Sequence, residues 1–160
     1  MEYNQTAYYK TPIGTAKIEG NSNGIVAITV IDEAVETSKN IPNCLQDCVQ
    51  QLEEYFKGIR TVFNLKLKPK GSTFQQKVWE ELQKVSFGKT RTYLEQSKEL
   101  GNVKAIRAVA AANGENPIWI VTPCHRIIGS DGSLTGYAGG IWRKKWLLNH
   151  ESSLKQQSLF

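Results

Sequence analysis

The sequence predicts an α+β protein, because segments rich in β-forming residues precede segments whose apolar residues have helical spacing. Residues 15–19 and 25–31 are rich in β-formers, and the Gly- and Asn-rich stretch 20–24 between them is typical of a hairpin loop. From residue 73 onward, apolar residues recur every three or four positions, which is the helical period. We therefore expect a domain of strands and one helix, followed by a mostly helical domain.

The N-terminal domain is expected to contain one helix and one further strand. Pro42 opens the helix and Gly58 ends it. Residues 62–67 alternate apolar and polar side chains, which predicts a strand. Residues 68–72 contain Pro and Gly and read as a linker, so we place the domains at 1–70 and 71–160. The apolar face of the helix comprises Leu45, Cys48, Val49, Leu52 and Phe56, and that of the strand comprises Phe63, Leu65 and Leu67.

The C-terminal domain begins with a helix over residues 73–85, whose apolar stripe runs from Phe74 to Val85. Thr92, with Glu95 three residues later, forms a capping box that opens a helix reaching Gly101. Asn102 caps a second helix over residues 103–113. Two short helices joined by a glycine turn are a helix-turn-helix candidate. Residues 118–121 are expected to form a short buried strand, and residues 142–150 a last helix.

The second helix of this pair is rich in alanine and carries a single arginine, Arg107. A helix that reads bases in the major groove usually presents several Arg, Lys, Asn or Gln side chains. A slim helix instead suits close approach to a narrow groove without sequence readout. From the helix alone, however, tight packing in a protein core explains the alanines better.

Composition sets only broad limits on function. The chain has 160 residues, a formal net charge of +5 and a pI near 9.1. This moderately basic balance is compatible with a polyanionic partner but is common in other proteins. Residues 1–10 are polar and rich in tyrosine, so they do not resemble a signal peptide, and no apolar run is long enough to cross a bilayer. With three cysteines, an odd number, we expect a reducing, cytoplasmic location, associated with the nucleoid if the source is a bacterium.

The strongest chemical signal is Cys124 followed by His125. A cysteine reacts as the thiolate and needs a nearby cation, base or helix N-terminus to become one. A tight turn near Pro123 would bring the two side chains together, and Glu151 is a candidate to orient the histidine. A buried, inert cysteine is the alternative. Cys44 and Cys48 make only half a zinc site, so we interpret them as structural and expect no metal.

Taken together, several motifs resemble the O6-alkylguanine-DNA alkyltransferase family. The likeness is dense from residue 73 to residue 151 and looser before residue 70, where it rests on strand order and on Thr11-Pro12-Ile13-Gly14. It is carried by Phe74-Gln75-x-x-Val78-Trp79, Gly114-Glu115-Asn116-Pro117, Pro123-Cys124-His125-Arg126, Tyr137-Ala138-Gly139-Gly140 and Trp146-Leu147-Leu148-Asn149-His150-Glu151.

The resemblance implies a ribonuclease H-like N-terminal domain followed by a winged helix-turn-helix-like domain. It implies that Cys124 accepts the alkyl group of O6-alkylguanine, and possibly of O4-alkylthymine, in a single irreversible turnover. His125 would act as base through a bridging water, held by Glu151. The implied partner is alkylated double-stranded DNA, bound by a monomer from the minor groove without regard to sequence. No cofactor is implied.

The resemblance also assigns roles around this centre. Asn116 would tie the two helices to the active-site segment, Arg107 would fill the gap left by a flipped base, and Tyr93 would donate a proton to the leaving guanine. Ala138 stands where many members have a serine, so backbone amides would contact the base oxygen instead. The pocket would be shaped by Val109, Asn113, Tyr137, Ala138 and Gly139, and the DNA would be contacted by Tyr93, Ala105, Arg107, Ala108 and Arg126.

Three alternative functions remain open at this stage. A cysteine hydrolase would use Cys124, His125 and Glu151 repeatedly and ignore DNA. A non-enzymatic DNA-binding module would need a base-reading helix, and residues 103–113 are poor in such side chains. A methyltransferase with a soluble donor would need a nucleotide site, and the sequence has no G-x-G-x-x-G or P-loop pattern.

Overall fold

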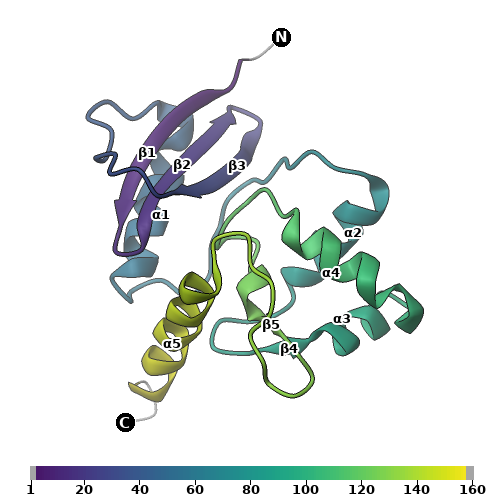
Figure 1. Ribbon diagram of the computed structural model, residues 1–160. Helices are drawn as coiled ribbons and strands as arrows, with labels where there is room; N and C mark the ends of the chain where they lie inside the picture. The colour runs from purple at the N-terminus through teal and green to yellow at the C-terminus, as the bar shows by residue number, and fades with distance from the viewer. Residues whose placement is uncertain (1–2, 158–160) are drawn as a thin grey trace. The chain divides into compact units, whose positions relative to one another are not determined.

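The computed structural model describes residues 3–157, which form two compact units. The first unit contains the chain up to Lys70 together with Pro117–Trp119, and the second contains Gly71–Asn116 and the chain from Ile120 onward. Figure 1 shows strands and one helix in the first unit and mostly helices in the second, so the predicted α+β class is confirmed. Nothing in the sequence indicates that residues 117–119 belong with the first unit.

The first unit contains a three-stranded antiparallel sheet in the order β1-β2-β3. Its strands are β1 (Gln5–Thr11), β2 (Gly14–Asn21) and β3 (Gly24–Ile31). The two strands expected from the sequence are present, and Gly24 ends their turn with a φ of 147°, which favours glycine. Strand β1 was not predicted, because only Ala7 and Thr11 along it are buried and its apolar pattern is therefore weak.

Helix α1 (Asn43–Phe56) covers this sheet and supplies much of the first core. It begins directly after Pro42, as predicted, and ends before Gly58, whose φ is 80°. The buried face differs from the predicted one at its end, where Tyr55 is fully buried and Phe56 is partly exposed. The buried side chains of the helix are Leu45, Cys48, Val49, Gln51, Leu52 and Tyr55.

The free edge of β3 is paired by two short segments instead of a full strand. Ile25 forms a bridge with Leu67, and Ile28 forms a bridge with Ile118. The strand predicted at residues 62–67 is therefore wrong, although Phe63, Leu65 and Leu67 do share the less exposed face. The single bridge to Ile25 satisfies only two backbone groups of residues 62–68, the carbonyl of Lys66 and the N–H of Lys68. The rest of that segment has no ladder partner and is irregular.

The strand predicted at residues 118–121 is also wrong, although its burial was correctly predicted. All four residues are buried, but only Ile118 pairs with the sheet and the chain then turns. Ile120 has a φ of 69°, which is rare for a β-branched residue and marks a strained turn. This turn carries the chain from the first unit back into the second.

The second unit opens with α2 (Thr73–Leu82), which is three residues shorter than predicted. Ser72 and Gln75 form a capping box at its start, and the indole N–H of Trp79 donates to the carbonyl of Ala112 at 2.9 Å. Two short parallel strands follow, β4 (Arg91–Thr92) and β5 (Ile127–Ile128). The core comprises Val78, Trp79, Leu82, Val85, Val109, Ala112 and Ile127.

The predicted helix pair is present as α3 (Tyr93–Glu99) and α4 (Ile106–Gly114), with a 3₁₀ turn η1 (Val103–Ala105) between them. The Thr92–Glu95 capping box and the Asn102 cap are both confirmed. The buried amides of Gln96 and Asn113 exchange two hydrogen bonds of 2.8 Å and fix the two helices to each other. The last helix, α5 (Ile141–Gln157), is longer than predicted at both ends.

Two glycines of the helix pair are expected to respond oppositely to alanine. Gly101 has a φ of 85°, whereas Gly114 has no positive φ, and neither would bring a Cβ within 4 Å of another group. Gly101→Ala should lower the unfolding free energy by about 1 kcal/mol through backbone strain. Gly114→Ala should raise it by about 0.5 kcal/mol by restricting the unfolded chain. Urea unfolding of both variants tests this, and equal effects would contradict the assigned turn.

Candidate active site

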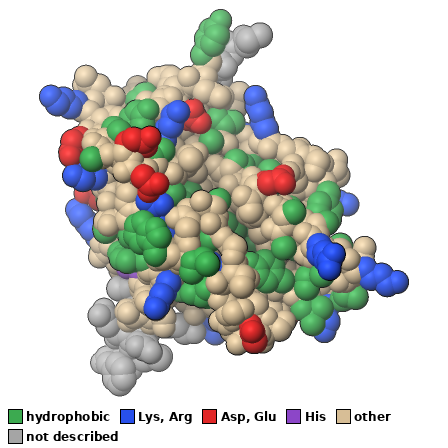
Figure 2. All heavy atoms as spheres, in the orientation of Figure 1, with side chains coloured by type: hydrophobic (Ala, Val, Ile, Leu, Met, Phe, Trp, Pro, Cys, Tyr) green, Lys and Arg blue, Asp and Glu red, His purple; other side chains and the backbone are tan. Residues whose placement is uncertain are grey.

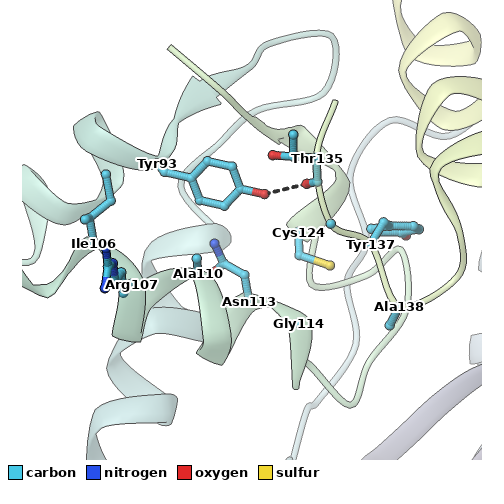
Figure 3. A pocket seen from close by; sticks show the side chains of 11 residues that line it. Tyr93, Ile106, Arg107, Ala110, Asn113, Gly114, Cys124, Thr135, Tyr137 and Ala138 are labelled. Atoms are coloured by element: carbon cyan, nitrogen blue, oxygen red, sulfur yellow. Dashed lines mark hydrogen bonds between the residues drawn. The ribbon is translucent and has the colours of Figure 1, made fainter. Parts of the chain in front are cut away.

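The second unit contains a cavity of about 520 Å³ with Cys124 in its wall (Figure 3). Helices α3 and α4 supply one side and a loop before α5 supplies the other. The wall presents more apolar than polar surface, although about half of the lining residues carry a polar group, a mixture that is common in ligand pockets. The lining residues are Tyr93, Ile106, Arg107, Ala110, Asn113, Gly114, Cys124, Thr135, Gly136, Tyr137 and Ala138.

Cys124 begins a single 3₁₀ turn, η2 (Cys124–Arg126), that follows Pro123. This is the tight turn that the Cys-His pair requires, and it places the thiol at the pocket and the imidazole in the protein interior. Asn116 donates from Nδ2 to the carbonyl of Thr122 at 2.8 Å and lies 3.4 Å from the Cys124 sulfur. Asn116 therefore fixes the backbone and the sulfur of the segment together.

The thiol of Cys124 is protonated at rest. Burial raises its pKa, while the Asn116 amide and the positive charge of Lys144 act in the opposite direction without outweighing burial. A thiol of raised pKa reacts only if a base removes its proton. The site must therefore include a neutral base close to the sulfur.

Glu151 is a buried carboxylate shared by two side chains. Its Oε2 lies 2.7 Å from Nε2 of His125, and Arg126 bonds both oxygens, at 2.8 and 3.0 Å. Burial disfavours ionisation of Glu151, but His125 and Arg126 together hold its pKa well below the usual range. Burial lowers the pKa of His125, which Glu151 only partly offsets, so His125 is neutral near pH 7.

The ionised Glu151 selects one tautomer of His125. A carboxylate only accepts hydrogen bonds, so Nε2 carries the proton and Nδ1 carries the lone pair. Nδ1 of His125 is buried, and it has no hydrogen-bond partner among the described residues. His125 thus presents an unused acceptor in the same turn as the Cys124 thiol, which is the arrangement of a nucleophile, a base and an orienting acid.

Arg126 is buried and bonded within the protein, which is at odds with the DNA contact that the resemblance implied. Its side chain is only 6% exposed, and besides Glu151 it donates to the carbonyl of Val85 at 2.7 Å. A guanidinium held by three buried acceptors has no surface to offer a phosphate. Its place in the structure is to neutralise Glu151.

Two predicted pocket residues lie outside the pocket. Val109 is fully buried in the core of the second unit, because it lies about 100° around α4 from the pocket-lining Ala110. Gly139 is buried and its carbonyl accepts a hydrogen bond from Arg143. Asn113, Tyr137 and Ala138 do line the pocket, as the resemblance implied.

The predicted DNA-contacting residues of the helix pair differ in exposure. Arg107 and Ala108 are exposed, whereas Ala105 is partly buried against the core. Residues 102–114 include Lys104 and Arg107 and no acidic residue. Figure 2 shows Lys and Arg side chains at the edge of the molecule over α3 and α4. This surface is suited to contact with a polyanion.

Lys144 is a site residue that the sequence did not reveal. It is fully buried, and its Nζ lies 3.2 Å from the carbonyl of Thr135 and 3.5 Å from the Tyr93 hydroxyl, which itself donates to Thr135 at 2.9 Å. Burial lowers the pKa of Lys144, and the nearby Cys124 acts against this shift. The only signal in the sequence was a pair of cationic residues in the first turn of a helix, where the dipole disfavours positive charge.

Neither a metal site nor a membrane span is found in residues 3–157. No group of three or more His, Cys, Asp or Glu side chains is arranged to hold a metal ion in this part of the chain. Across the same residues, no helix combines the length and the apolar character required to cross a membrane.

Cys48 is buried and has its pKa raised to about 12 by burial, which makes its thiol unreactive.

Two domain families match successive parts of the chain. The ribonuclease-like domain of 6-O-methylguanine DNA methyltransferase matches residues 5–69, and the DNA binding domain of the same family matches residues 73–153. A methylated-DNA–protein-cysteine methyltransferase of Methanosarcina acetivorans is 42% identical over 156 residues, covering 92% of this chain and 97% of the other. The constitutive enzyme of that name from Bacillus subtilis is 40% identical, covering 94% and 96%.

Solved structures give the same result. The crystal structure of O6-methylguanine methyltransferase from Mycobacterium tuberculosis is 39% identical, with a TM-score of 0.82 over 96% of this chain and 94% of the other. The crystal structure of M. tuberculosis OGT in complex with DNA is 40% identical, with a TM-score of 0.84 over 92% of each chain. The similarity thus extends across both units.

The buried His125–Glu151 pair predicts a loss of stability in mild acid. Because the pKa of His125 falls on folding, the unfolded chain binds more protons than the folded chain once the pH is below about 6.5. The unfolding free energy should be constant from pH 8 to 7 and fall from pH 7 to 5. Urea unfolding across this range measures it. His125→Gln should flatten the slope, and an equal slope in both proteins would contradict the neutral histidine.

Proposed function

We propose that this chain, which belongs to the family of methylated-DNA–protein-cysteine methyltransferases, repairs DNA by transferring the alkyl group of O6-alkylguanine to Cys124. The observation that supports this most directly is the position of Cys124. Its thiol lines a mostly apolar pocket. His125, which is buried and paired with Glu151, is the next residue in the same 3₁₀ turn. The DNA-binding-domain match over residues 73–153 includes all three residues.

The transfer is a substitution at the alkyl carbon. His125 Nδ1 takes the thiol proton of Cys124, directly or through a water, and Glu151 stabilises the imidazolium that forms. The sulfur then attacks the carbon, the S–C bond forms as the C–O6 bond breaks, and the electron pair goes to the guanine. The guanine leaves as the neutral base after gaining one proton. No cofactor is needed for this balance.

Tyr93 is suited to deliver the proton to the guanine. Its hydroxyl reaches the pocket, and in the resting state its proton is directed to the carbonyl of Thr135 (Figure 3). The ammonium of Lys144 lies within 3.5 Å of the same hydroxyl and polarises it. When Tyr93 turns its proton toward the base, Lys144 already bonds the Thr135 carbonyl and keeps it satisfied.

The pocket can receive the base only if the nucleotide leaves the duplex. The O6 atom of guanine is inaccessible in the helical stack, and extruding a base costs a few kcal/mol. Helix α4 presents mostly alanines to its exposed side, so it can approach a narrow groove closely. Arg107 lines the pocket and is exposed, which suits it to fill the space that the base vacates. This contact reads no base edge, so we expect binding without sequence preference.

The reaction is expected to occur once per molecule. A thioether is not hydrolysed by a neighbouring imidazole, and no second cysteine lies among the residues that line the pocket to take the alkyl group over. The product is therefore an alkylated protein and an intact guanine. Turnover would end with one event, which makes the protein a stoichiometric reagent.

The transfer is tested by intact mass measurement after incubation with a duplex oligonucleotide that contains O6-methylguanine. The wild-type chain should gain one methyl group in place of one proton, and peptide mapping should locate it on Cys124. Cys124→Ser should gain nothing. Cys44→Ser is the matched control and should react like the wild type, because Cys44 lies in the other unit. Repeated turnover or an unmodified wild-type protein would refute the proposal.

Arg107→Ala should slow repair in duplex DNA by about ten-fold or more while leaving the reaction with free O6-methylguanine nearly unchanged. The reason is that extrusion costs a few kcal/mol only in a duplex, and each 1.4 kcal/mol corresponds to ten-fold. Lys104→Ala is the control, since Lys104 is an exposed cation of the same segment that does not line the pocket. The measurement is the single-turnover rate on each of the two substrates. Equal losses of rate on the duplex and on the free base would show that Arg107 does not assist base extrusion.

A further inference from the structure

Two consecutive cations, Arg143 and Lys144, are buried in the first turn of α5, and Arg143 has no role in the mechanism above. Arg143 is 5% exposed and Lys144 is fully buried. Positive charge in the first turn opposes the helix dipole, and burial adds a desolvation cost. Helix stability therefore does not explain either residue. Their side chains must gain compensating contacts elsewhere.

Those contacts lie at the two ends of the loop that forms one side of the pocket. Lys144 Nζ lies 3.2 Å from the carbonyl of Thr135, where the loop begins, and Arg143 Nη1 donates to the carbonyl of Gly139 at 2.9 Å, where it ends. The lining residues between them are Gly136, Tyr137 and Ala138. Hydrogen bonds from charged donors are the stronger kind, so the loop is held at both ends by the helix that follows it.

Trp142 covers the arginine that makes the second contact. The guanidinium carbon of Arg143 lies 4.4 Å from the centre of the Trp142 ring, which is a cation–π contact. The indole itself is 56% exposed, which is unusual for so large an apolar side chain. By shielding the guanidinium from water, Trp142 strengthens the hydrogen bond from Arg143 to Gly139.

We infer that Arg143 is a positioning residue that sets how large an alkyl group the pocket accepts. This rests on the proposed function. The loop residues Tyr137 and Ala138 face the same cavity as Cys124, so the place of the loop fixes the space beside the sulfur. On this inference, a methyl group fits with the loop held in place, whereas a bulky substituent requires the loop to shift. The bond from Arg143 to Gly139 opposes that shift and so favours small alkyl groups.

The contact is expected to act through the loop and not through DNA binding. Arg143 is buried and bonds the backbone of Gly139, so its replacement changes the pocket and not the charged surface. Both free O6-methylguanine and free O6-benzylguanine therefore report on it without DNA. The ratio of their transfer rates is the informative quantity, since a loss of folded protein lowers both rates equally.

The experiment compares Arg143→Met, Arg143→Lys and Lys145→Met with the wild type, using single-turnover rates on the two free bases. Lys145 is the matched control, because it is the next cation of the same helix but is exposed. Arg143→Met should raise the benzyl-to-methyl rate ratio by about ten-fold, the effect of losing one charge-assisted hydrogen bond. Arg143→Lys should restore much of the wild-type ratio, and Lys145→Met should leave it unchanged.

The outcomes separate the two proposals. A wild-type protein that reacts with neither base nor with methylated duplex overturns the proposed function and this inference with it. An active wild type whose rate ratio is unchanged in Arg143→Met overturns the inference alone. A thermal melt of each variant accompanies the rates, and a ratio that changes equally in Lys145→Met would assign the effect to helix charge instead of the loop.

Discussion

The structure of the site depends on one buried carboxylate, Glu151, and on the arginine that neutralises it. An ionised Glu151 with only His125 as partner would draw a proton onto the imidazole, and a charged imidazole is no base. Arg126 supplies the positive charge instead, through bonds of 2.8 and 3.0 Å to the two oxygens. His125 is thereby left neutral and oriented. The proposed activation of the half-buried Cys124 thiol depends on that neutrality.

The sequence identified the residues that meet at the candidate site better than the geometry that holds them. Cys124, His125 and Glu151 stand in motifs whose residue types are those of a nucleophile, a base and an orienting acid. The capping box at Thr92 and the Asn102 cap were predictable because they are local, requiring only residues three positions apart or fewer. The α+β class followed from periodicity, which is likewise a local property.

What could not be predicted depends on contacts between distant segments. The burial of Arg126 requires Glu151 and Val85, which are 25 and 41 residues away, so its motif alone pointed to the surface. Lys144 is concealed in the same way, because its partners Tyr93 and Thr135 come from other elements. Of the two segments wrongly predicted as strands, residues 118–121 are buried as expected and residues 62–67 only turn their apolar side chains to the less exposed face, and each segment finds a single bridge on β3. Periodicity reports burial, and it does not report whether a partner strand is available.

The brief return of the chain to the first unit at Pro117–Trp119 makes the two units unsuitable for exchange as separate modules. The carbonyl of Pro117 and the N–H of Trp119 both bond Ile28 of β3, at 2.9 and 3.0 Å. A contiguous gene segment that encoded only the second unit would carry these residues without the strand that pairs with them. Their backbone is joined to the reactive cysteine through the strained turn at Ile120. Recombination that replaced the ribonuclease-like half would therefore have to preserve an edge strand equivalent to β3, which links the inheritance of the two halves.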